Sequence, residues 1–328
     1  MDIYHDSDAD LNVLKGKKIA VLGYGAQGRA QALCLHDSGL DVTVGVRKNG
    51  PSWNKVKEDG LKVSEIPAAV KDADVVMMLL PDEVQPDLYK EIVEPNMKKG
   101  AALEFAHGFS ITYGLIKPPE GIDVIMMAPK SPGDMERIAY LEGFGVPALI
   151  SIHKDSTGNA KKIALALAKG IGSTRAGVFE TSFDFETKSD LFGEQAVLCG
   201  GVTALIKAGY DTLREGGYPP EIAYFEVLHE VKLIVDLIQA GGFSKMWHVV
   251  SNTAEYGGLT RRDRVITKES KEGMRSILAD IESGKFKDDW RAEWKNGLKE
   301  LKRVEAEDTS LELETVGKEI RSLFERKR

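Results

Sequence analysis

A glycine-rich turn between a strand and a helix is the feature that most constrains the fold of this chain. Residues 17–22 read KKIAVL, a β-rich run, and a helix-like stretch follows from residue 29. In this order a G-x-G-x-x-G pattern is typical of a dinucleotide-binding βαβ unit, because glycines let the backbone approach a pyrophosphate at a helix N-terminus. The candidate cofactor ligands are Gly23, Tyr24, Gly25, Ala26, Gln27 and Gly28.

Strand-like and helix-like segments alternate through the first half of the chain. Further β-rich runs occupy residues 41–46, 74–80, 101–105, 123–128 and 147–152. This alternation predicts an α/β fold with a doubly wound, mainly parallel sheet of the Rossmann type. Helical patterns replace the β-rich runs after about residue 180. We therefore expect an NAD(P)-binding domain over residues 1–181 and an all-helical domain over residues 182–328.

The residues after the second strand bear on the choice of cofactor. An NAD-specific enzyme usually has Asp or Glu there, whereas this chain has Arg47 and Lys48, with Ser52 shortly after. Two cations and a hydroxyl suit a 2′-phosphate, so we expect NADPH to be accepted. Alternatively, Arg47 stacks on the adenine and Lys48 is solvated, in which case NADH is accepted as well.

Polar residues follow three later strands, where ligands bind in parallel sheets. They are Asp82 in LLPDE, His107 in EFAHGF and Lys130 in MAPKSPG, and Gly133 of this last segment is a further cofactor-binding candidate. Each of the three polar residues could instead be a solvated loop residue. We expect His107 and Lys130 to line the cleft.

Two pairs of acids have helical spacing in the second half: Asp190 with Glu194, and Glu226 with Glu230. A spacing of four places both acids of a pair on one helix face. The same stripes continue through apolar residues, among them Val197, Leu205, Leu233 and Leu237. The alternative is a pair of solvated acidic faces, but the apolar neighbours favour acids that face the interior.

Four ionised carboxylates facing a core cost several kcal/mol or more apiece without a positive partner, and no basic residues share these stripes. We therefore infer a divalent-metal cluster. Oxygen ligands favour Mg2+ or Mn2+ over zinc, and four acids suffice for two ions if one bridges.

Composition limits the partners. The net charge of -7 and the absence of a basic run argue against nucleic acid or an anionic membrane, which leaves a small-molecule substrate. No apolar run approaches the roughly 20 residues of a membrane span. Cys34 and Cys199 form no C-x-x-C pattern and the N-terminal residues are acidic. We expect a cytoplasmic protein.

A set of motifs together resembles ketol-acid reductoisomerase (acetohydroxy-acid isomeroreductase) of the short, class I type, from the N-terminus to about residue 260. The resemblance implies an enzyme that catalyses a Mg2+-dependent alkyl migration in 2-acetolactate or 2-aceto-2-hydroxybutyrate. Reduction by NAD(P)H then yields a 2,3-dihydroxy acid in the biosynthesis of valine and isoleucine. The motifs are GYGAQGRAQA, LLPDE, FAHGF, APKSPG, EGFGVPALI, DLFGEQAVLCGG, FEVLHEVKLIVDLI and SNTAEYG.

The resemblance also implies residue roles. Asp190 would bridge two Mg2+ ions, Glu194 would complete one site, and Glu226 and Glu230 would serve the other. Ser251 would hydrogen-bond the substrate, although the same residue could simply cap a helix. The implied catalytic residues are His107 beside the nicotinamide, Lys130 in proton movement, and Glu230.

The resemblance to the short form of the family also implies an interlocked homodimer with a knotted helical domain. Glu226, Glu230 and Ser251 of one chain would then complete the site of the other, so the active sites would be shared in a homodimer or a larger homo-oligomer.

Departures from the family pattern leave the cofactor open. Ala26 and Arg29 stand where many relatives have Ser and His, and Gly50 and Pro51 replace residues that offer more donors to a phosphate. NADPH, NADH or both remain compatible with these residues. Two other functions remain alternatives: a metal-free 3-hydroxyacid dehydrogenase and a non-catalytic dinucleotide sensor. Neither needs a metal, so loss of turnover on chelation separates them from the reductoisomerase.

Overall fold

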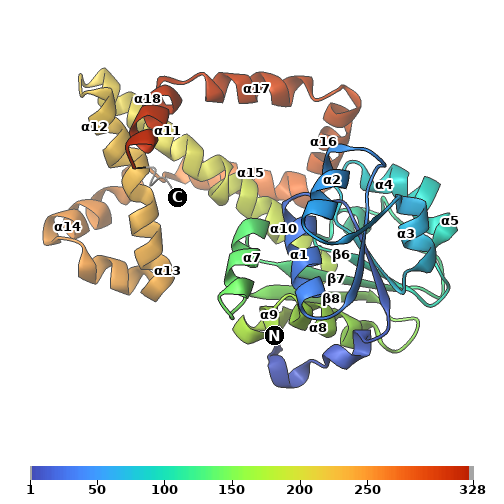
Figure 1. Cartoon of the computed structure of the whole chain (residues 1–328). Helices are drawn as coiled ribbons and strands as arrows, with labels where there is room; N and C mark the ends of the chain where they lie inside the picture. The colour runs from blue at the N-terminus through green and yellow to red at the C-terminus, as the bar shows by residue number, and fades with distance from the viewer. Residues whose placement is uncertain (1, 325–328) are drawn as a thin grey trace. The chain divides into compact units, whose positions relative to one another are not determined.

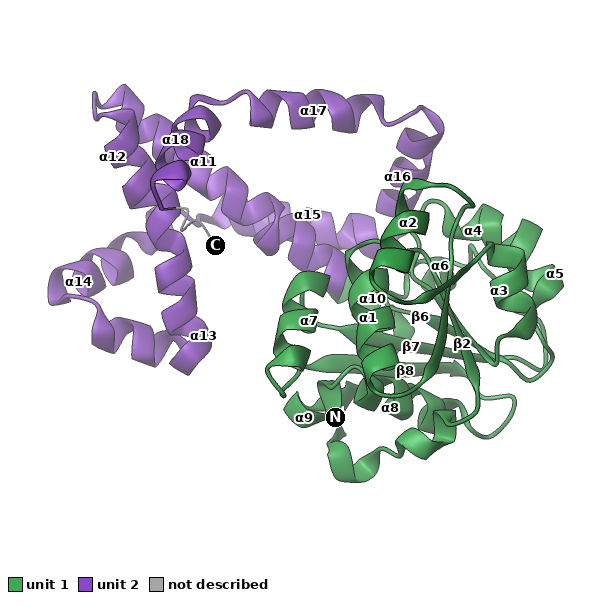
Figure 2. Cartoon of the chain, in the orientation of Figure 1, with its two compact units in different colours: residues 1–189 green, residues 190–328 purple. Residues whose placement is uncertain are grey.

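The computed structural model describes residues 2–324, and the chain divides into two compact units, Met1–Ser189 and Asp190–Arg328 (Figure 2). The point of division lies inside one helix, α10 (Phe183–Gly193). The predicted domain boundary between residues 181 and 182 stays a prediction.

Unit 1 is built on a nine-stranded sheet with the order β1-β9-β8-β7-β6-β5-β2-β3-β4 (Figure 1). The six β-rich runs of the sequence all form strands. The strands are β1 (Ile3–Tyr4), β2 (Lys18–Leu22), β3 (Asp41–Gly45), β4 (Lys62–Ser64), β5 (Val75–Met78), β6 (Ala102–Phe105), β7 (Asp123–Pro129), β8 (Ala148–Lys154) and β9 (Val178–Glu180).

The predicted doubly wound sheet is confirmed, but the sheet is mixed. Strand β2 pairs in parallel with β3 on one side and β5 on the other, so the chain reverses direction across the sheet at this strand. Two pairings are antiparallel, β7 with β8 and β1 with β9. Strands β1, β4 and β9 were not predicted because each is only two or three residues long and lacks an apolar run.

Helices cover both faces of this sheet. On one face, α1 and α8 contribute Leu35 and Leu167 to a buried cluster with the strands. On the other face, α3 and the π-helical turn η3 contribute Val70 and Val93 to a second cluster. The helical elements of unit 1 are η1 (Asp6–Asp8), η2 (Leu11–Leu14), α1 (Ala26–Asp37), α2 (Pro51–Glu58), α3 (Ile66–Asp72), α4 (Gln85–Leu88), η3 (Tyr89–Val93), α5 (Glu94–Asn96), α6 (Phe109–Thr112), α7 (Gly133–Leu141), α8 (Ala160–Gly170) and α9 (Ser173–Ala176).

Unit 2 is helical throughout its described part, as predicted; the predicted knot stays a prediction. Helix α13 bends at Gly242, whose φ of 70° no helix accommodates. The elements are η4 (Glu194–Leu198), α11 (Gly200–Glu215), α12 (Pro220–Tyr224), η5 (Phe225–His229), α13 (Glu230–Val249), α14 (Asn252–Arg261), η6 (Arg262–Arg264), α15 (Lys268–Glu282), α16 (Lys285–Lys295), α17 (Lys299–Thr309) and α18 (Glu312–Phe324).

The apolar stripes beside the four predicted metal ligands are exposed in the single chain. Val197 and Leu205 are each 50% exposed and Leu233 is 54% exposed. Glu226 and Glu230 are exposed as well. The prediction that these acids face the interior is therefore wrong for Glu194, Glu226 and Glu230 in the single chain, whereas Asp190 is half-buried. Helical periodicity identifies the apolar side of a helix but does not say which surface covers it.

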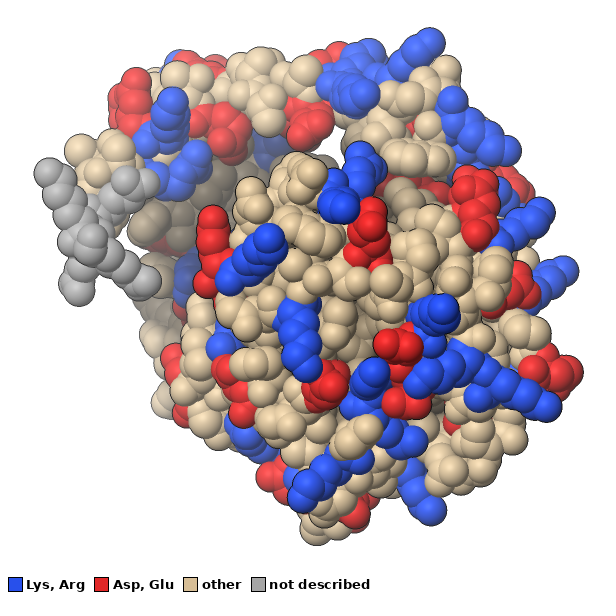
Figure 3. Space-filling view, turned by 45° about the vertical axis from the view of Figure 1, so that its right-hand side comes forward, with Lys and Arg blue, Asp and Glu red and all other residues tan. Residues whose placement is uncertain are grey.

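Length and composition single out one continuous helical stretch, Phe183–Glu215, that could cross a membrane, with a mean hydropathy of 1.2 over its most apolar window. This corrects the statement that no run approaches a span. It is weak evidence for a membrane, because helices of soluble proteins satisfy the same test. On the face of the molecule in Figure 3, acidic and basic side chains are interspersed.

Candidate functional site

A cavity of about 740 Å3 lies in unit 1 beyond the carboxyl ends of β2, β3, β5 and β6. We call it the glycine-turn cavity. It brings together the predicted residues of the turn with Arg47, Ser52, Asp82 and His107, which come from four separate parts of the sequence. Its lining comprises Gly23–Gly28, Gly45–Arg47, Gly50–Ser52, Ile66, Met78–Asp82, Val84, Gln85, Leu88, Ala106 and His107.

The turn itself requires glycine and leaves amides free. Gly23 has a φ of 98°, and a Cβ there would overlap the carbonyl oxygen of Leu79. Gly25 is the N-cap of α1 and has no side chain to satisfy the first amides of that helix. A Cβ at Gly25 would meet nothing within 4 Å. The helix N-terminus therefore offers donors and a positive dipole to an anion in the cavity.

An ionic cluster fastens this turn to the end of α2. Arg29 donates to both oxygens of Asp59, at 2.7 and 2.8 Å, and the Tyr24 hydroxyl donates to Oδ2 of the same carboxylate at 2.8 Å. The guanidinium of Arg29, opposed by burial and assisted by Tyr24, holds the pKa of Asp59 below its ordinary value. The sequence identified Tyr24 but gave no reason to connect it with Asp59.

The cofactor-selecting residues are only partly assembled as predicted. Arg47 and Ser52 line the glycine-turn cavity, but Lys48 does not. Helix α2 begins at Pro51, so Ser52 lies in its first turn. Of the two predicted cations, Arg47 is therefore the one that lines the cavity.

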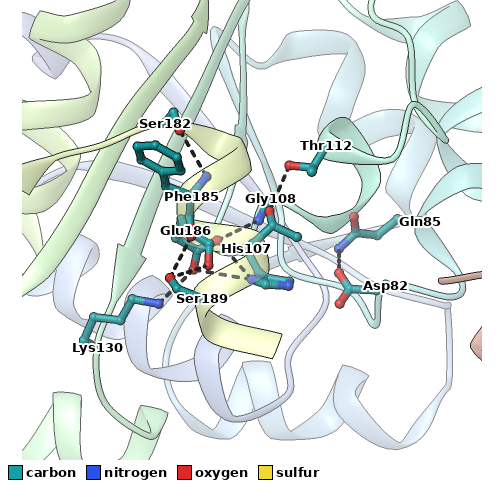
Figure 4. A network of polar contacts seen from close by, with 11 residues as sticks. Asp82, Gln85, His107, Gly108, Thr112, Lys130, Ser182, Phe185, Glu186 and Ser189 are labelled. Carbon is teal, nitrogen blue, oxygen red and sulfur yellow. Dashed lines mark hydrogen bonds and ion pairs between the residues drawn. The ribbon is translucent and has the colours of Figure 1, made fainter. Parts of the chain in front are cut away.

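A buried carboxylate, Glu186 on α10, connects two of the predicted catalytic residues (Figure 4). Its Oε1 accepts from Nζ of Lys130 at 2.8 Å, and its Oε2 lies 3.1 Å from Nδ1 of His107. The backbone amide of Gly108 also donates to Oε2, at 3.2 Å. The Glu186 side chain is 1% exposed, whereas His107 and Lys130 are 20% and 33% exposed.

The ionisation of Glu186 follows from these contacts. Burial alone would raise the pKa of its carboxyl, but the contacts with His107 and Lys130 outweigh burial and hold the pKa below its ordinary value. Glu186 is therefore a fixed negative charge. It orients both side chains, of which His107 also lines the glycine-turn cavity.

Asp82 is held by a second network at the cavity wall. The side-chain amide of Gln85 donates to Oδ1 of Asp82 at 3.2 Å and to the carbonyl of Leu80 at 2.8 Å. The carbonyl oxygen of Gln85 accepts from the buried hydroxyl of Ser110 at 2.9 Å. This connects the loop after β5 to α6.

Lys130 and Gly133 do not line the glycine-turn cavity. Lys130 reaches Glu186 instead. Gly133, the first residue of α7, packs against the backbone of α1, and a Cβ there would overlap the carbonyl oxygen of Ala26. Gly133 thus supports the glycine turn from behind.

Three of the four acids predicted to bind metal lie in or next to irregular turns of their helices, whereas Asp190 lies within regular α10. Helix α10 gives way to the π-helical turn η4 at Glu194, and η5 contains Glu226 and ends just before Glu230. Such π-bulges occur frequently at functional sites. Along α10, Asp190 follows Glu186 by one turn, and one ligand atom from each of His107, Glu186 and Asp190 lies within 4.8 Å of the others.

Within residues 2–324 the structure does not bring all four predicted metal ligands together, since this group of ligand atoms includes Asp190 but not Glu194, Glu226 or Glu230. Ser251, the predicted substrate ligand, is the exposed N-cap of α14 and accepts from the amide of Ala254 at 3.2 Å. The capping alternative is therefore observed, and a substrate contact by Ser251 stays a prediction.

Sequence reasoning missed Glu186 and Gln85. The signal for Glu186 was present, because residues 186, 190 and 194 repeat an acid at every fourth position. Gln85 had no such signal, since its role depends on a loop and a helix that meet only in the fold.

Comparison with known proteins identifies the family. Residues 13–177 match the acetohydroxy acid isomeroreductase NADPH-binding domain, and residues 183–326 match the ketol-acid reductoisomerase C-terminal domain. The chain belongs to the ketol-acid reductoisomerase family. It is accordingly an enzyme, an oxidoreductase of the reductoisomerase type, and membership decides against the sensor and the metal-free dehydrogenase.

Individual ketol-acid reductoisomerases agree over nearly the whole length. Two enzymes named ketol-acid reductoisomerase (NADP(+)), from Methanococcus maripaludis and Methanocaldococcus jannaschii, are each 54% identical to this chain. Each match covers 98% of this chain. It covers 98% of the Methanococcus maripaludis enzyme and 97% of the Methanocaldococcus jannaschii enzyme. The structure of an NADH-preferring ketol-acid reductoisomerase from an uncultured archaeon is 50% identical, with a TM-score of 0.97 over 99% of this chain and 100% of that one. A semialdehyde dehydrogenase NAD-binding protein from Cupriavidus necator, 17% identical with a TM-score of 0.61 over 81% and 99%, shares the fold.

Proposed function

We propose that this reductoisomerase acts on 2-acetolactate or 2-aceto-2-hydroxybutyrate, with Mg2+-dependent alkyl migration followed by reduction to the 2,3-dihydroxy acid. This places it in valine and isoleucine biosynthesis in the cytoplasm. The observation that supports this most directly is His107, which lines the glycine-turn cavity and also contacts the Glu186 carboxylate. His107 therefore joins the proposed dinucleotide-binding cavity to the polar cluster around Glu186.

The glycine-turn cavity fits a nicotinamide dinucleotide. The free amides of α1 suit the pyrophosphate and Arg47 with Ser52 suits the adenosine ribose, while His107 lies at the end of β6, next to the nicotinamide position. Because relatives include both NADP(+) enzymes and an NADH-preferring one, we propose that this chain accepts NADPH and NADH.

The acidic groups fit Mg2+. Carboxylate oxygens are the ligands that Mg2+ prefers, and Asp190 and Glu186 present them on successive turns of one helix. We propose that Asp190, Glu194, Glu226 and Glu230 bind two ions. When bound, Mg2+ would stabilise negative charge on the substrate oxygens and polarise its carbonyl.

The residues of this chain manage the protons. In the proposed mechanism Lys130 keeps its proton at Nζ because the Glu186 carboxylate stabilises the ammonium, and it donates a hydrogen bond to a substrate oxygen. His107 is held in orientation through its Nδ1 contact with Glu186. Ser251 would hydrogen-bond the substrate, and Glu230 would exchange a proton with it.

We further propose that the active site is shared in a homodimer or a larger homo-oligomer. Two observations support a second chain. The helices beside the acids expose large apolar residues, including Leu198, Leu205, Leu233 and Phe243. In the described residues, Glu226 and Glu230 also lie outside the ligand group that contains Asp190. A partner chain would cover the exposed apolar residues and would complete the group of metal ligands.

The test is the initial rate of nicotinamide oxidation with 2-acetolactate, for NADPH and NADH, each with Mg2+ and with the metal chelated. Turnover that vanishes on chelation and returns with Mg2+ supports the proposal. Turnover that persists without metal, or no turnover with either cofactor under any condition, contradicts it.

A further inference from the structure

Two carboxyl groups are buried behind the glycine-turn cavity and take no part in the chemistry above. Glu104 on β6 and Glu136 on α7 are both 0% exposed. Of their four carboxyl oxygens, Oε1 of Glu104 accepts a backbone hydrogen bond from Met127 at 3.3 Å. Within the described residues the other three have no hydrogen-bond donor.

The surrounding groups do not neutralise this pair. Arg137 follows Glu136 on α7, but its guanidinium donates to Oδ2 of Asp37 at 2.6 Å and to Sγ of Cys34 at 3.7 Å. On α9, Arg175 stacks on the Tyr140 ring. Burial raises the pKa of the Cys34 thiol to about 12, so the thiol is neutral.

Protons on the two acids resolve the unsatisfied atoms. An ionised carboxylate buried without a donor costs several kcal/mol, and two such groups repel each other. Burial raises the pKa of Glu136 to about 8. Burial, and then the charge of Glu136, raises the pKa of Glu104 well above its ordinary value. A neutral carboxylic acid provides an O–H donor and avoids the cost of a buried negative charge.

The pair is mechanically connected to the glycine turn. Gly133 begins α7 against the backbone of Ala26, too close for a Cβ, and the side-chain Nε2 of Gln27 donates to the carbonyl of Ser131 at 2.8 Å. Glu136 lies in the first turn of α7. A displacement of α7 away from α1 would therefore remove the contacts that support Ala26 and Gln27, which both line the cavity.

We propose that Glu104 and Glu136 are positioning residues for the glycine turn, which hold α7 in place as neutral carboxylic acids and loosen it when they ionise. The inference rests on dinucleotide binding in the glycine-turn cavity, which is part of the proposed function. Its expected consequence is a dinucleotide affinity that falls in alkaline solution, by up to about tenfold per pH unit for each proton lost.

The first test addresses the protons alone. Infrared spectra of the full-length protein at neutral pH should contain a protonated-carboxyl band that weakens as the pH is raised through 8 and is absent from the double variant Glu104→Gln, Glu136→Gln. A spectrum of the unaltered protein without that band overturns the proposal, even if the variant does not fold. Neither result depends on turnover. A failure of this proposal can therefore be distinguished from a failure of the proposed function.

The second test addresses the coupling. Dissociation constants for NADH and NADPH are measured by fluorescence between pH 7 and 9. The unaltered protein should lose affinity over this range, whereas the double glutamine variant, which cannot ionise, should not. The matched control is Glu142→Gln at the exposed end of the same helix, which should keep the original pH profile. A double variant with the pH profile of the unaltered protein overturns the coupling.

Discussion

Nζ of Lys130 lies 2.8 Å from Oε1 of Glu186, and the other carboxylate oxygen of Glu186 lies 3.1 Å from Nδ1 of His107. One buried carboxylate thus orients two cationic or hydrogen-bonding side chains from different strands. Because Glu186 makes both contacts at once, we expect its charge to matter more for catalysis than its volume.

Replacement of Glu186 by Gln keeps the shape and removes the charge. We expect kcat to fall roughly 100-fold, since Lys130 and His107 lose their orientation, while the dinucleotide dissociation constant changes little. Steady-state kinetics and fluorescence titration measure the two. Glu180→Gln is the matched control. Glu180 also pairs with a lysine, Nζ of Lys161 at 2.7 Å, but it does not line the cavity. Equal loss of kcat in both variants would contradict the prediction.

Replacement of Ser52 by Asp should shift preference towards NADH. Ser52 lines the cavity in the first turn of α2, where a carboxylate would repel a 2′-phosphate and accept from a ribose hydroxyl. We expect the ratio of kcat/KM for NADH over NADPH to rise about tenfold or more. Lys48→Ala should change the ratio much less, because Lys48 does not line the cavity. A larger change in this ratio from Lys48→Ala than from Ser52→Asp would show that Lys48, and not Ser52, governs the choice of cofactor.

Complementation tests the shared site. We expect Asp190→Asn and Glu226→Gln to be inactive separately but to recover roughly a quarter of the unaltered activity when co-expressed in equal amounts, because half of the dimers are hybrids with one intact site each. Affinity tags of two kinds isolate the hybrids for assay. Inactive hybrids would show that both acids act within the same chain.

The Asp59 cluster should contribute stability in a defined pH range. The pKa of the Asp59 carboxyl is held below its ordinary value of 3.8 in the folded protein. The contribution of Asp59 to the free energy of unfolding is therefore present above pH 3.8 and is lost as the pH falls through the lower folded-state pKa. We expect Asp59→Asn to lower the free energy of unfolding by about 1–2 kcal/mol at neutral pH, a modest figure because Arg29 is 38% exposed. Urea titrations at pH 7 and at successively lower pH should show a difference between the two proteins that is largest at pH 7 and shrinks as the pH falls below 3.8.

Local patterns predicted much of the fold. The β-rich runs became strands because each is a short apolar segment bounded by turn residues, and Gly23 was recognisable because only glycine fits its φ of 98° and its contact with Leu79. The short strands β4 and β9 were not predictable in this way. They exist because a neighbouring strand offers hydrogen bonds, not because of an apolar run of their own.

The sequence by itself therefore determined the strand, turn and helix at Gly23–Gly28, the helical second half, and the identity of the acids at positions 190, 194, 226 and 230. These depend on spacing along the chain. The tertiary structure decided that Arg47 rather than Lys48 lines the cavity, that Glu186 joins Lys130 to His107, and that the acid-bearing stripes are exposed in the single chain. Such relationships depend on which surfaces meet after folding, and periodicity contains no information about the opposing surface.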